Sequence, residues 1–440
     1  MEHTSSYWKT VFCDLRHENK THPNFVCILL ALLTIPMGYA VNGFAVALLV
    51  LVSLVSFKRN NFRFEITQIF PILLFALMAL SLLWTYDLKS SAKALQKGLP
   101  LILIPICFLI SRPFSTEQKR SLIGFFSKGM VVFTLYWLVK AAFRFAMGED
   151  VSVFFYHELV TEDVNAIHVA VYITVAISYF LTRESKTLAE KLTLLLLSVF
   201  LILLSSKNIT VVFLVISAVY GYRRFKSRQR SNLLVGALVL CVLAAIAMMG
   251  RIKDRFIAEF QDGHSINKEM SNERGNVYNV SIGQAWSQEK FYGNDYFPGT
   301  AFRVYQIHIF TEMLHEDTIL FTGYGLNASA FKIEEKGRQH GVYDGEGREE
   351  GYLRKNFHNQ YVQLFAELGI FGFLILIAML AINLKNAIQT KDFVHISFAI
   401  LMISLFLTES FLSRQRGIVF FTIMYCLLNS APAVIAPKQE

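Results

Sequence analysis

Long apolar segments separated by short polar stretches constrain this chain of 440 residues more than any other feature. Hydrophobic residues make up 54% of the chain and charged residues only 17%, whereas about a quarter of a typical soluble domain is charged. A bilayer core of about 30 Å is crossed by roughly 20 apolar residues in a helix. The pattern therefore predicts an all-α, polytopic transmembrane protein of about 12 spans.

The apolar segments give the expected positions of these spans. The first two are nearly continuous and are broken near Pro36, Met37 and Gly38, so they form either one kinked span or a re-entrant pair. The expected spans are 25–41, 42–57, 67–86, 96–111, 121–145, 164–182, 189–205, 208–222, 232–250, 359–384, 393–411 and 417–434.

Basic residues in the loops predict the orientation of the chain, because cytoplasmic loops of membrane proteins carry an excess of Lys and Arg. The same rule accounts for the net charge of +9 without nucleic acid, which we do not expect as a partner. The rule places both termini in the cytoplasm and residues 251–358 outside. The basic connections are those that contain Lys58, Arg59 and Arg63; Arg112, Lys119 and Arg120; Arg183, Lys186 and Lys191; Arg223, Arg224, Lys226, Arg228 and Arg230; and Lys385 and Lys391.

The chain is thus expected to have three parts: an N-terminal membrane region (1–250), an outer loop (251–358) and a C-terminal membrane region with a cytoplasmic tail (359–440). The loop of about 108 residues is too long for a passive connection. Its residues 301–317 look helical and 323–329 (GYGLNAS) form a glycine-rich turn, so we expect a small, mostly helical cap on the membrane. Residues 336–351 are expected to be flexible and solvated.

The strongest local motif is HNQYVQLFAELGIFGFLI, residues 358–375, where the outer loop enters the tenth span. His358 at the membrane boundary is either a general base, since the imidazole pKa lies near neutrality, or a helix-capping residue. Arg303 in the preceding helix is either a bidentate phosphate ligand or a solvated arginine.

Several other polar residues lie on the same expected side of the membrane. Lys207 stands in a tight outer turn, where it either binds an anionic headgroup or extends harmlessly to the surface. Glu409, Arg414 and Arg416 flank another outer turn, and Glu409 either pairs with one of the arginines or takes part in the site. His168, at the start of the sixth span, is either a site residue or a structural histidine.

Together these cations suit a diphosphate attached to a lipid. The sequence carries no Asp-rich or His/Cys metal motif and no nucleotide-binding loop, so we expect a reaction without metal or other cofactor. The energy for the reaction would come from an activated, lipid-linked donor.

The Arg303 helix, the GYGLNAS turn and HNQYVQLFAELGIFGF resemble the signature of the O-antigen ligase and Wzy-type polymerase family. The resemblance covers about residues 160–430, and its specific part is 300–375. It implies a glycosyltransferase of GT-C type in the bacterial inner membrane. Such enzymes take a glycan from undecaprenyl diphosphate on the periplasmic face, without a metal. Ligases transfer it to a lipid A core sugar and polymerases to another repeat unit.

By the same resemblance, His358 matches the proposed base and Arg303 a diphosphate ligand. Asn359 or Tyr361 is expected to orient the acceptor, while Lys207 stands where many members carry an arginine. The closing TESFLSRQRGIVFF favours a ligase. The alternatives are a Wzy-type polymerase, a transporter of a lipid-linked or small anionic substrate, and a structural membrane protein. A transporter is disfavoured because the sequence shows neither a two-fold repeat nor paired broken helices.

Overall fold

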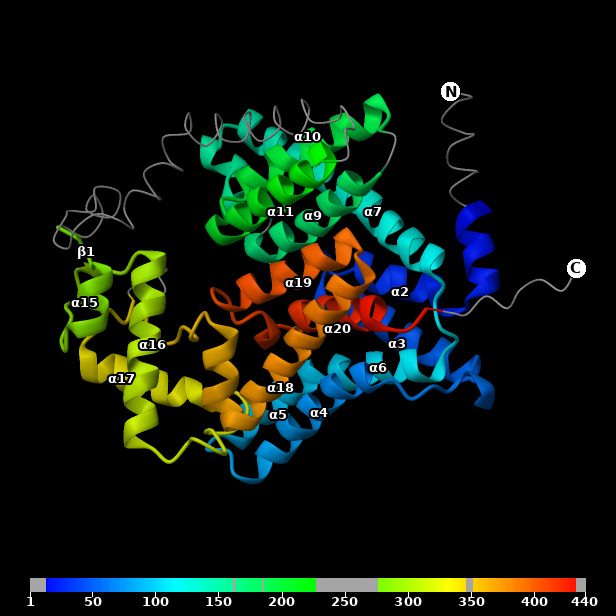
Figure 1. Cartoon of the computed structure of the whole chain (residues 1–440). Coiled ribbons are helices and arrows are strands. Elements are labelled where there is room, and N and C mark those ends of the chain that lie inside the picture. The colour runs from blue at the N-terminus through cyan, green and yellow to red at the C-terminus, as the bar shows by residue number, and fades with distance from the viewer. Residues whose placement is uncertain (1–12, 161–163, 184–185, 227–275, 346–350, 433–440) are drawn as a thin grey trace, which may run out of the picture.

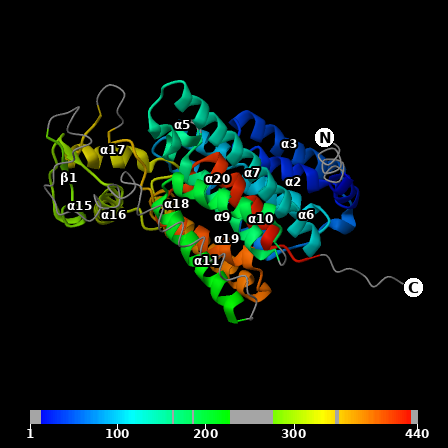
Figure 2. The same cartoon turned by 90° about the horizontal axis from the view of Figure 1, so that it is seen from above.

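A computed structural model describes residues 13–160, 164–183, 186–226, 276–345 and 351–432. This part of the chain is mostly helical, with one small sheet of two parallel strands. A large body of packed helices carries a smaller lobe at one end, on the left in Figure 1, and Figure 2 shows the same division from above. The lobe corresponds to the expected cap on the membrane region.

The body consists of helices whose apolar side chains form one continuous core. Their bounds are α2 (Asn24–Leu33), α3 (Tyr39–Val55), α4 (Ile66–Leu80), α5 (Leu88–Gly98), α6 (Pro100–Ile110), α7 (Thr116–Ala146), α8 (Tyr156–Val160), α9 (Ala166–Thr182), α10 (Leu188–Leu203), α11 (Lys207–Lys226), α18 (Gln360–Thr390), α19 (Phe393–Phe406) and α20 (Gln415–Asn429), with short 3-10 turns at Arg59–Asn61, Ser81–Leu83, Val151–Phe154 and Phe411–Ser413.

Four helical segments within the described residues are long and apolar enough to cross a membrane: Ile66–Leu83, Leu88–Ile110, α7 and α18. Further apolar helices of 10–17 residues, α2, α3, α9, α19 and the Lys207–Tyr222 part of α11, pack among them. A polytopic, mostly helical membrane protein is therefore confirmed, while the number of 12 spans stays a prediction. The expected span 232–250 lies outside the described residues.

The apolar residues 25–57 form two helices that fold back on each other. Asn24 at the start of α2 donates a hydrogen bond to Ser53 near the end of α3, with 2.8 Å between Nδ2 and Oγ. At the other end, Nδ2 of Asn42 donates to the carbonyl of Ala31 at 2.8 Å. Contacts at both ends require an antiparallel pair, so the break near Pro36 separates two helices and does not kink a single one.

Helix α7 spans the body and defines its two ends. Ser115 and Gln118 form a capping box at its start, which satisfies backbone N–H groups of the first turn. At its far end, Arg144 pairs with Glu158 of α8, with 2.7 Å between Nη2 and Oε2. The 31 residues of α7 make it about 46 Å long, more than the thickness of a bilayer core. Its two ends therefore belong to opposite polar surfaces.

The cap comprises α15 (Ile282–Ser287), α16 (Gly299–Glu316), α17 (Ser329–His340) and the strands β1 (Tyr278–Asn279) and β2 (Asp295–Tyr296). Aromatic and aliphatic side chains form a core of its own. The helix expected at 301–317 is confirmed. The prediction of a flexible, solvated stretch at 336–351 is wrong for 336–340, because these residues continue α17 and Lys336 is buried beside Glu312 and Glu316.

The glycine-rich turn of the cap is joined to α18 through the backbone. Tyr324 and Gly325 donate hydrogen bonds to the carbonyls of Ala366 and Glu367, both at 2.9 Å. Helix α18 is broken at Gly369, where φ is 66°, and a Cβ there would overlap the backbone of Phe321. Positive φ and close backbone approach both require glycine. This interlock, formed by residues 320–325 and 366–370, fixes the cap on the N-terminal turns of α18.

Candidate active site

His358 lies immediately before α18 in a strained backbone conformation. Its φ is 46°, which few residues other than glycine adopt, and such strain occurs preferentially at functional sites. The neighbours of His358 hold it there: its N–H donates to Oδ1 of Asn356 at 3.1 Å, and the Asn359 side chain accepts from the N–H groups of Tyr361 and Val362. Phe357 is fully buried. The imidazole is therefore placed by a rigid backbone rather than by a loose loop.

A cavity of about 780 Å³ lies between the cap and the ends of the body helices. His358, Arg303, Glu409 and Arg414, which are far apart in the sequence, all line it. The remaining lining residues are Tyr39, Lys97, Tyr156, His157, Asn165, Ile167, Asn327, Ser329, Ala330, Ile333, Arg354, Lys355, Asn356, Gln363, Ser413 and Gln415. The cavity thus brings together loops and helix ends that are far apart in the sequence.

Glu409 lies directly behind the imidazole of His358. Its Oε2 is 3.5 Å from Nδ1, and only 3% of its side chain is exposed. Burial alone would raise the pKa of this carboxyl, but the interaction with His358, and then the nearby His168 and Arg414, outweigh burial and lower the pKa. Glu409 is therefore a carboxylate at neutral pH. It favours a proton on Nδ1 and leaves Nε2 as the acceptor nitrogen.

Arg303 is held in place by backbone carbonyls at the edge of the same cavity. Its Nε donates to the carbonyl of Thr408 at 2.9 Å and its Nη1 to that of Gly299 at 2.8 Å. Within the part of the chain that the structure describes, Nη2 has no hydrogen-bond partner. The guanidinium is thus oriented by the protein and keeps donors for a ligand. Because Thr408 precedes Glu409, the same turn positions both the arginine and the carboxylate.

Among the residues that the structure describes, the charged side chains lining the cavity are mostly cations, and Glu409 is the one acidic residue. The sequence pattern points to Arg303 and Arg414 but not to Lys97, Arg354 or Lys355. Lys97 was assigned to the start of a span, and the other two lie between the stretch 336–351 and the motif that begins at His358, where no motif was recognised. Only their three-dimensional proximity identifies them. An excess of positive charge in a half-enclosed cavity suits an anionic ligand.

Two of the expected cations do not line this cavity. Arg416 is buried, donates from Nη2 to the carbonyl of Met37 at 2.7 Å, and stacks on the ring of Tyr39 at 4.3 Å. It therefore supports the turn between α2 and α3. Lys207 begins α11 beside Asn208, whose Nδ2 donates to Oγ1 of Thr408 at 2.7 Å. Lys207 is thus the chain neighbour of a residue that contacts Thr408, whose carbonyl holds Arg303.

The remaining expected site residues have contacts within the body. Asn359 caps α18 and is buried, while the Tyr361 hydroxyl donates to the carbonyl of Ile403 in α19 at 3.0 Å. His168 is 1% exposed, its ring lies 4.4 Å from that of Phe411, and neither ring nitrogen has a hydrogen-bond partner among the described residues. His168 thus lies inside the body of packed helices, and its assignment to the site stays a prediction.

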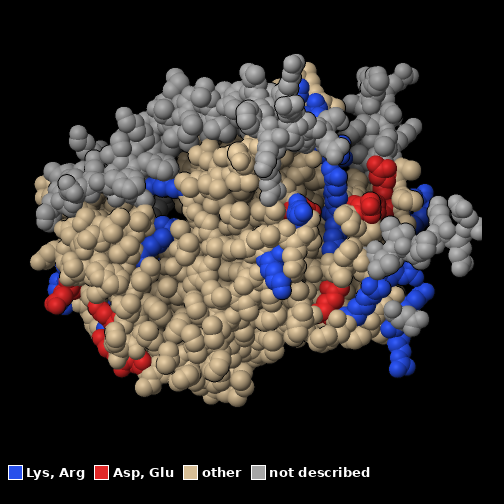
Figure 3. Space-filling model, viewed as in Figure 1, with Lys and Arg blue, Asp and Glu red and all other residues tan. Residues whose placement is uncertain are grey.

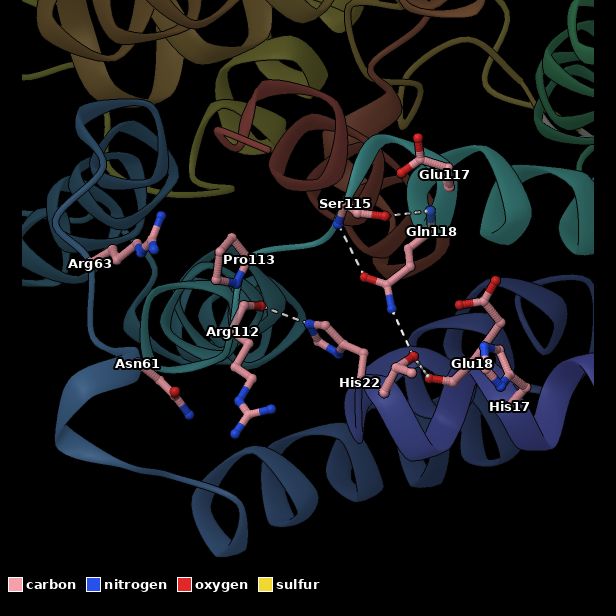
Figure 4. A pocket seen from close by; sticks show the side chains of 11 residues that line it. His17, Glu18, His22, Asn61, Arg63, Arg112, Pro113, Ser115, Glu117 and Gln118 are labelled. Atoms are coloured by element: carbon pink, nitrogen blue, oxygen red, sulfur yellow. Dashed lines mark hydrogen bonds between the residues drawn. The ribbon is translucent and has the colours of Figure 1, made fainter. Parts of the chain in front are cut away.

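A second cavity of about 570 Å³ lies at the opposite end of α7 (Figure 4). There, Gln118 of the capping box donates to Thr21, and Nε2 of His22 contacts the carbonyl of Arg112 at 2.7 Å. Figure 3 shows Lys and Arg gathered mainly toward this end of the body, next to a broad uncharged face. The hydrogen bonds in this cavity close helix ends, so we assign it no chemistry.

These features define a class: a multi-pass helical membrane protein with a cap and a cation-rich cavity beneath it. The family model described as O-antigen ligase matches residues 192–377, from α10 to the middle of α18, and includes both Arg303 and His358. This match agrees with the resemblance found in the sequence, which is confirmed for residues 192–377. The match supports a ligase- or polymerase-type role in O-antigen assembly. No curated protein matches the chain.

Proposed function

We propose that the chain is an O-antigen ligase-type glycosyltransferase. It moves a glycan from undecaprenyl diphosphate to a sugar hydroxyl of the lipid A core on the periplasmic face of the inner membrane. One observation carries the proposal: the imidazole of His358 and the guanidinium of Arg303 line one cavity, with the Glu409 carboxylate behind the imidazole.

His358 is the general base of the proposed reaction. With Nδ1–H directed at Glu409, Nε2 accepts the proton of the acceptor hydroxyl while that oxygen attacks the anomeric carbon. The bond between this carbon and the diphosphate oxygen breaks as the new glycosidic bond forms. The proton remains on His358, and Glu409 stabilises the resulting imidazolium, as a buried carboxylate does in catalytic triads.

Arg303 and Arg414 stabilise the departing diphosphate. Arg303 offers Nη2, while Arg414 is exposed at the cavity, directly before the first turn of α20. The N-terminus of a helix adds positive potential at this point. Charge accumulates on the diphosphate as it leaves, so these cations lower the barrier more than they strengthen donor binding. Lys207 stays a proposed further ligand, and its test is the Lys207→Arg variant, which restores a fork-shaped donor.

The proposed side of the membrane follows from the two ends of α7. The cavity lies at the end that bears Arg144, whereas the basic loops expected in the cytoplasm lie at the end that bears Ser115. Cysteine labelling of residues in the cap tests this orientation. Labelling by a membrane-impermeant reagent added to spheroplasts is the expected result, and protection until lysis would contradict a periplasmic site.

The activity is tested with purified full-length protein, a lipid-diphosphate-linked glycan and lipid A core. We expect His358→Ala to abolish transfer while donor binding persists, and Arg303→Ala to weaken both. Normal turnover by stable His358→Ala protein would exclude the general base. In a deletion strain, lipid-linked polymer left unattached to lipid A indicates a ligase. Lipid A that carries a single repeat unit indicates a polymerase, and an intact surface glycan would contradict both.

A further inference from the structure

Two histidines and a glutamate of the cap converge away from the cavity. His308 and Glu312 are one turn apart on α16, with 3.0 Å between Nε2 and Oε1. His340, the last residue of α17, places its Nε2 3.1 Å from Oε2 of the same carboxylate. Their three ligand atoms lie within 4.8 Å of one another. One carboxylate thus bridges imidazoles from two helices.

We propose that His308, Glu312 and His340 bind a divalent transition-metal ion, with Zn²⁺ as the best fit. Neutral imidazole nitrogens and a carboxylate oxygen are preferred zinc ligands, at about 2.0–2.2 Å from the ion. Two ligands one helical turn apart face the same side of a helix, and the third comes from the neighbouring helix. Small side-chain rotations bring the three atoms from their present spacing to that distance.

The burial of the three residues favours an ion held at the edge of the cap. The side chain of His340 is 8% exposed, while those of His308 and Glu312 are 22% and 25% exposed. The ion would be reached from solvent on the α16 side, where water completes its coordination. Both imidazoles must present an unprotonated nitrogen, so binding releases protons and weakens as pH falls.

Lys336 is the competitor for this site. Its Nζ lies 2.9 Å from Oε2 of Glu312, where an ammonium repels a cation. The same Nζ lies 2.6 Å from Oε1 of Glu316, so Lys336 keeps an ion pair when Glu312 turns to the metal. When the metal binds, it therefore replaces the Lys336 ammonium as the partner of Glu312. Removal of the ammonium should then strengthen metal binding.

Metal binding would fasten α17 to the last turns of α16. Arg303 stands near the start of α16 and His340 at the end of α17, and the two helices meet through this cluster. The ion is a structural link in this proposal and takes no part in glycan transfer. The sequence gives no sign of the cluster, because its third ligand, His340, lies on a different helix.

The test uses full-length protein in detergent, without a polyhistidine tag, after removal of metals with a chelator. Titration with Co²⁺ reports coordination by its visible absorption, and competition with Zn²⁺ gives the affinity. We expect one ion per chain, at least ten-fold weaker binding for His308→Gln and His340→Gln, and unchanged binding for His315→Gln, a matched exposed histidine on α16. Lys336→Met should bind more tightly than the unmodified protein.

The thermal midpoint without metal shows whether each variant is folded. Added Zn²⁺ should raise this midpoint in the unmodified protein and in His315→Gln, but not in His308→Gln or His340→Gln. Equal Co²⁺ binding by the unmodified protein and by the His308→Gln/His340→Gln double variant would overturn the proposal. The proposal would also be overturned if Lys336→Met bound the metal no more tightly than the unmodified protein, since the ammonium would then not occupy the site.

Discussion

Replacement of Glu409 by glutamine tests the His358–Glu409 pair with little change in shape. The substitution removes the negative charge and offers an amide N–H to Nδ1, which moves the imidazole proton to Nε2. In that tautomer Nε2 has no lone pair to accept a proton from the acceptor hydroxyl. The imidazolium formed in the reaction also loses its counter-charge.

The size of the effect follows from the separation of the two groups. For unit charges 3.5 Å apart, and an effective dielectric constant of about 20, the attraction is about 4–5 kcal/mol. The carboxylate is almost fully buried, so water screens it little. Loss of this stabilisation in the transition state lowers turnover about 10³-fold. Donor binding depends on the arginines and should change less than about three-fold.

The assay is initial-rate transfer by purified protein at neutral pH, with donor affinity measured separately. Glu158→Gln is the matched control, because Glu158 is an exposed carboxylate on the same side of the protein, paired with Arg144. We expect that variant to keep nearly full turnover. If Glu409→Gln folds normally and retains turnover within ten-fold of the unmodified enzyme, the carboxylate does not position or stabilise His358.

Three further predictions concern stability. Asn359→Ala should lower the free energy of unfolding by about 1 kcal/mol, because the cap of α18 is lost; the measurement is a lower thermal midpoint. A large loss of acceptor affinity at unchanged stability would instead indicate that Asn359 binds the acceptor. Gly369→Ala should sharply reduce the yield of folded protein, because its positive φ costs an alanine about 1–2 kcal/mol even before the overlap with Phe321 is counted. Gly43→Ala in α3 is the control: the space around Gly43 is open, so the yield in the same expression assay should be unchanged. Because the pKa of Glu409 is lowered in the folded protein, its ionised form stabilises the fold at pH values above the unfolded pKa near 4.5. This stabilisation is lost as pH falls through the lower folded pKa. The thermal midpoint of the unmodified protein should therefore fall more steeply in acid than that of Glu409→Gln.

The sequence predicted the helices well because membrane spans are long, apolar and independent of distant residues. Helix α16, the break near Pro36 and the ends of most body helices lie within a few residues of the expected positions. Residues 336–340 were predicted wrongly because their polarity looked like that of a flexible loop. Lys336 is polar and yet buried, and only its ion pairs across to α16 explain why.

The candidate site was predictable where a motif carried the information and not where proximity did. His358 and Arg303 belong to a recognisable pattern, so their common cavity could be expected. The distinction between Arg414, which lines the cavity, and Arg416, which stacks on Tyr39, depends on how the start of α20 meets the turn before α3. Two arginines two residues apart in a turn give no local sign of which one faces a ligand.

The interlock between residues 320–325 and 366–370 also limits how the molecule can admit two bulky substrates. The backbone hydrogen bonds across it oppose a swing of the cap about the start of α18. In the proposed reaction, the lipid-borne glycan and its acceptor would therefore reach the cavity without a swing of the cap. Length variation should be disruptive at Gly323, where even one inserted residue would misplace His358 relative to Arg303.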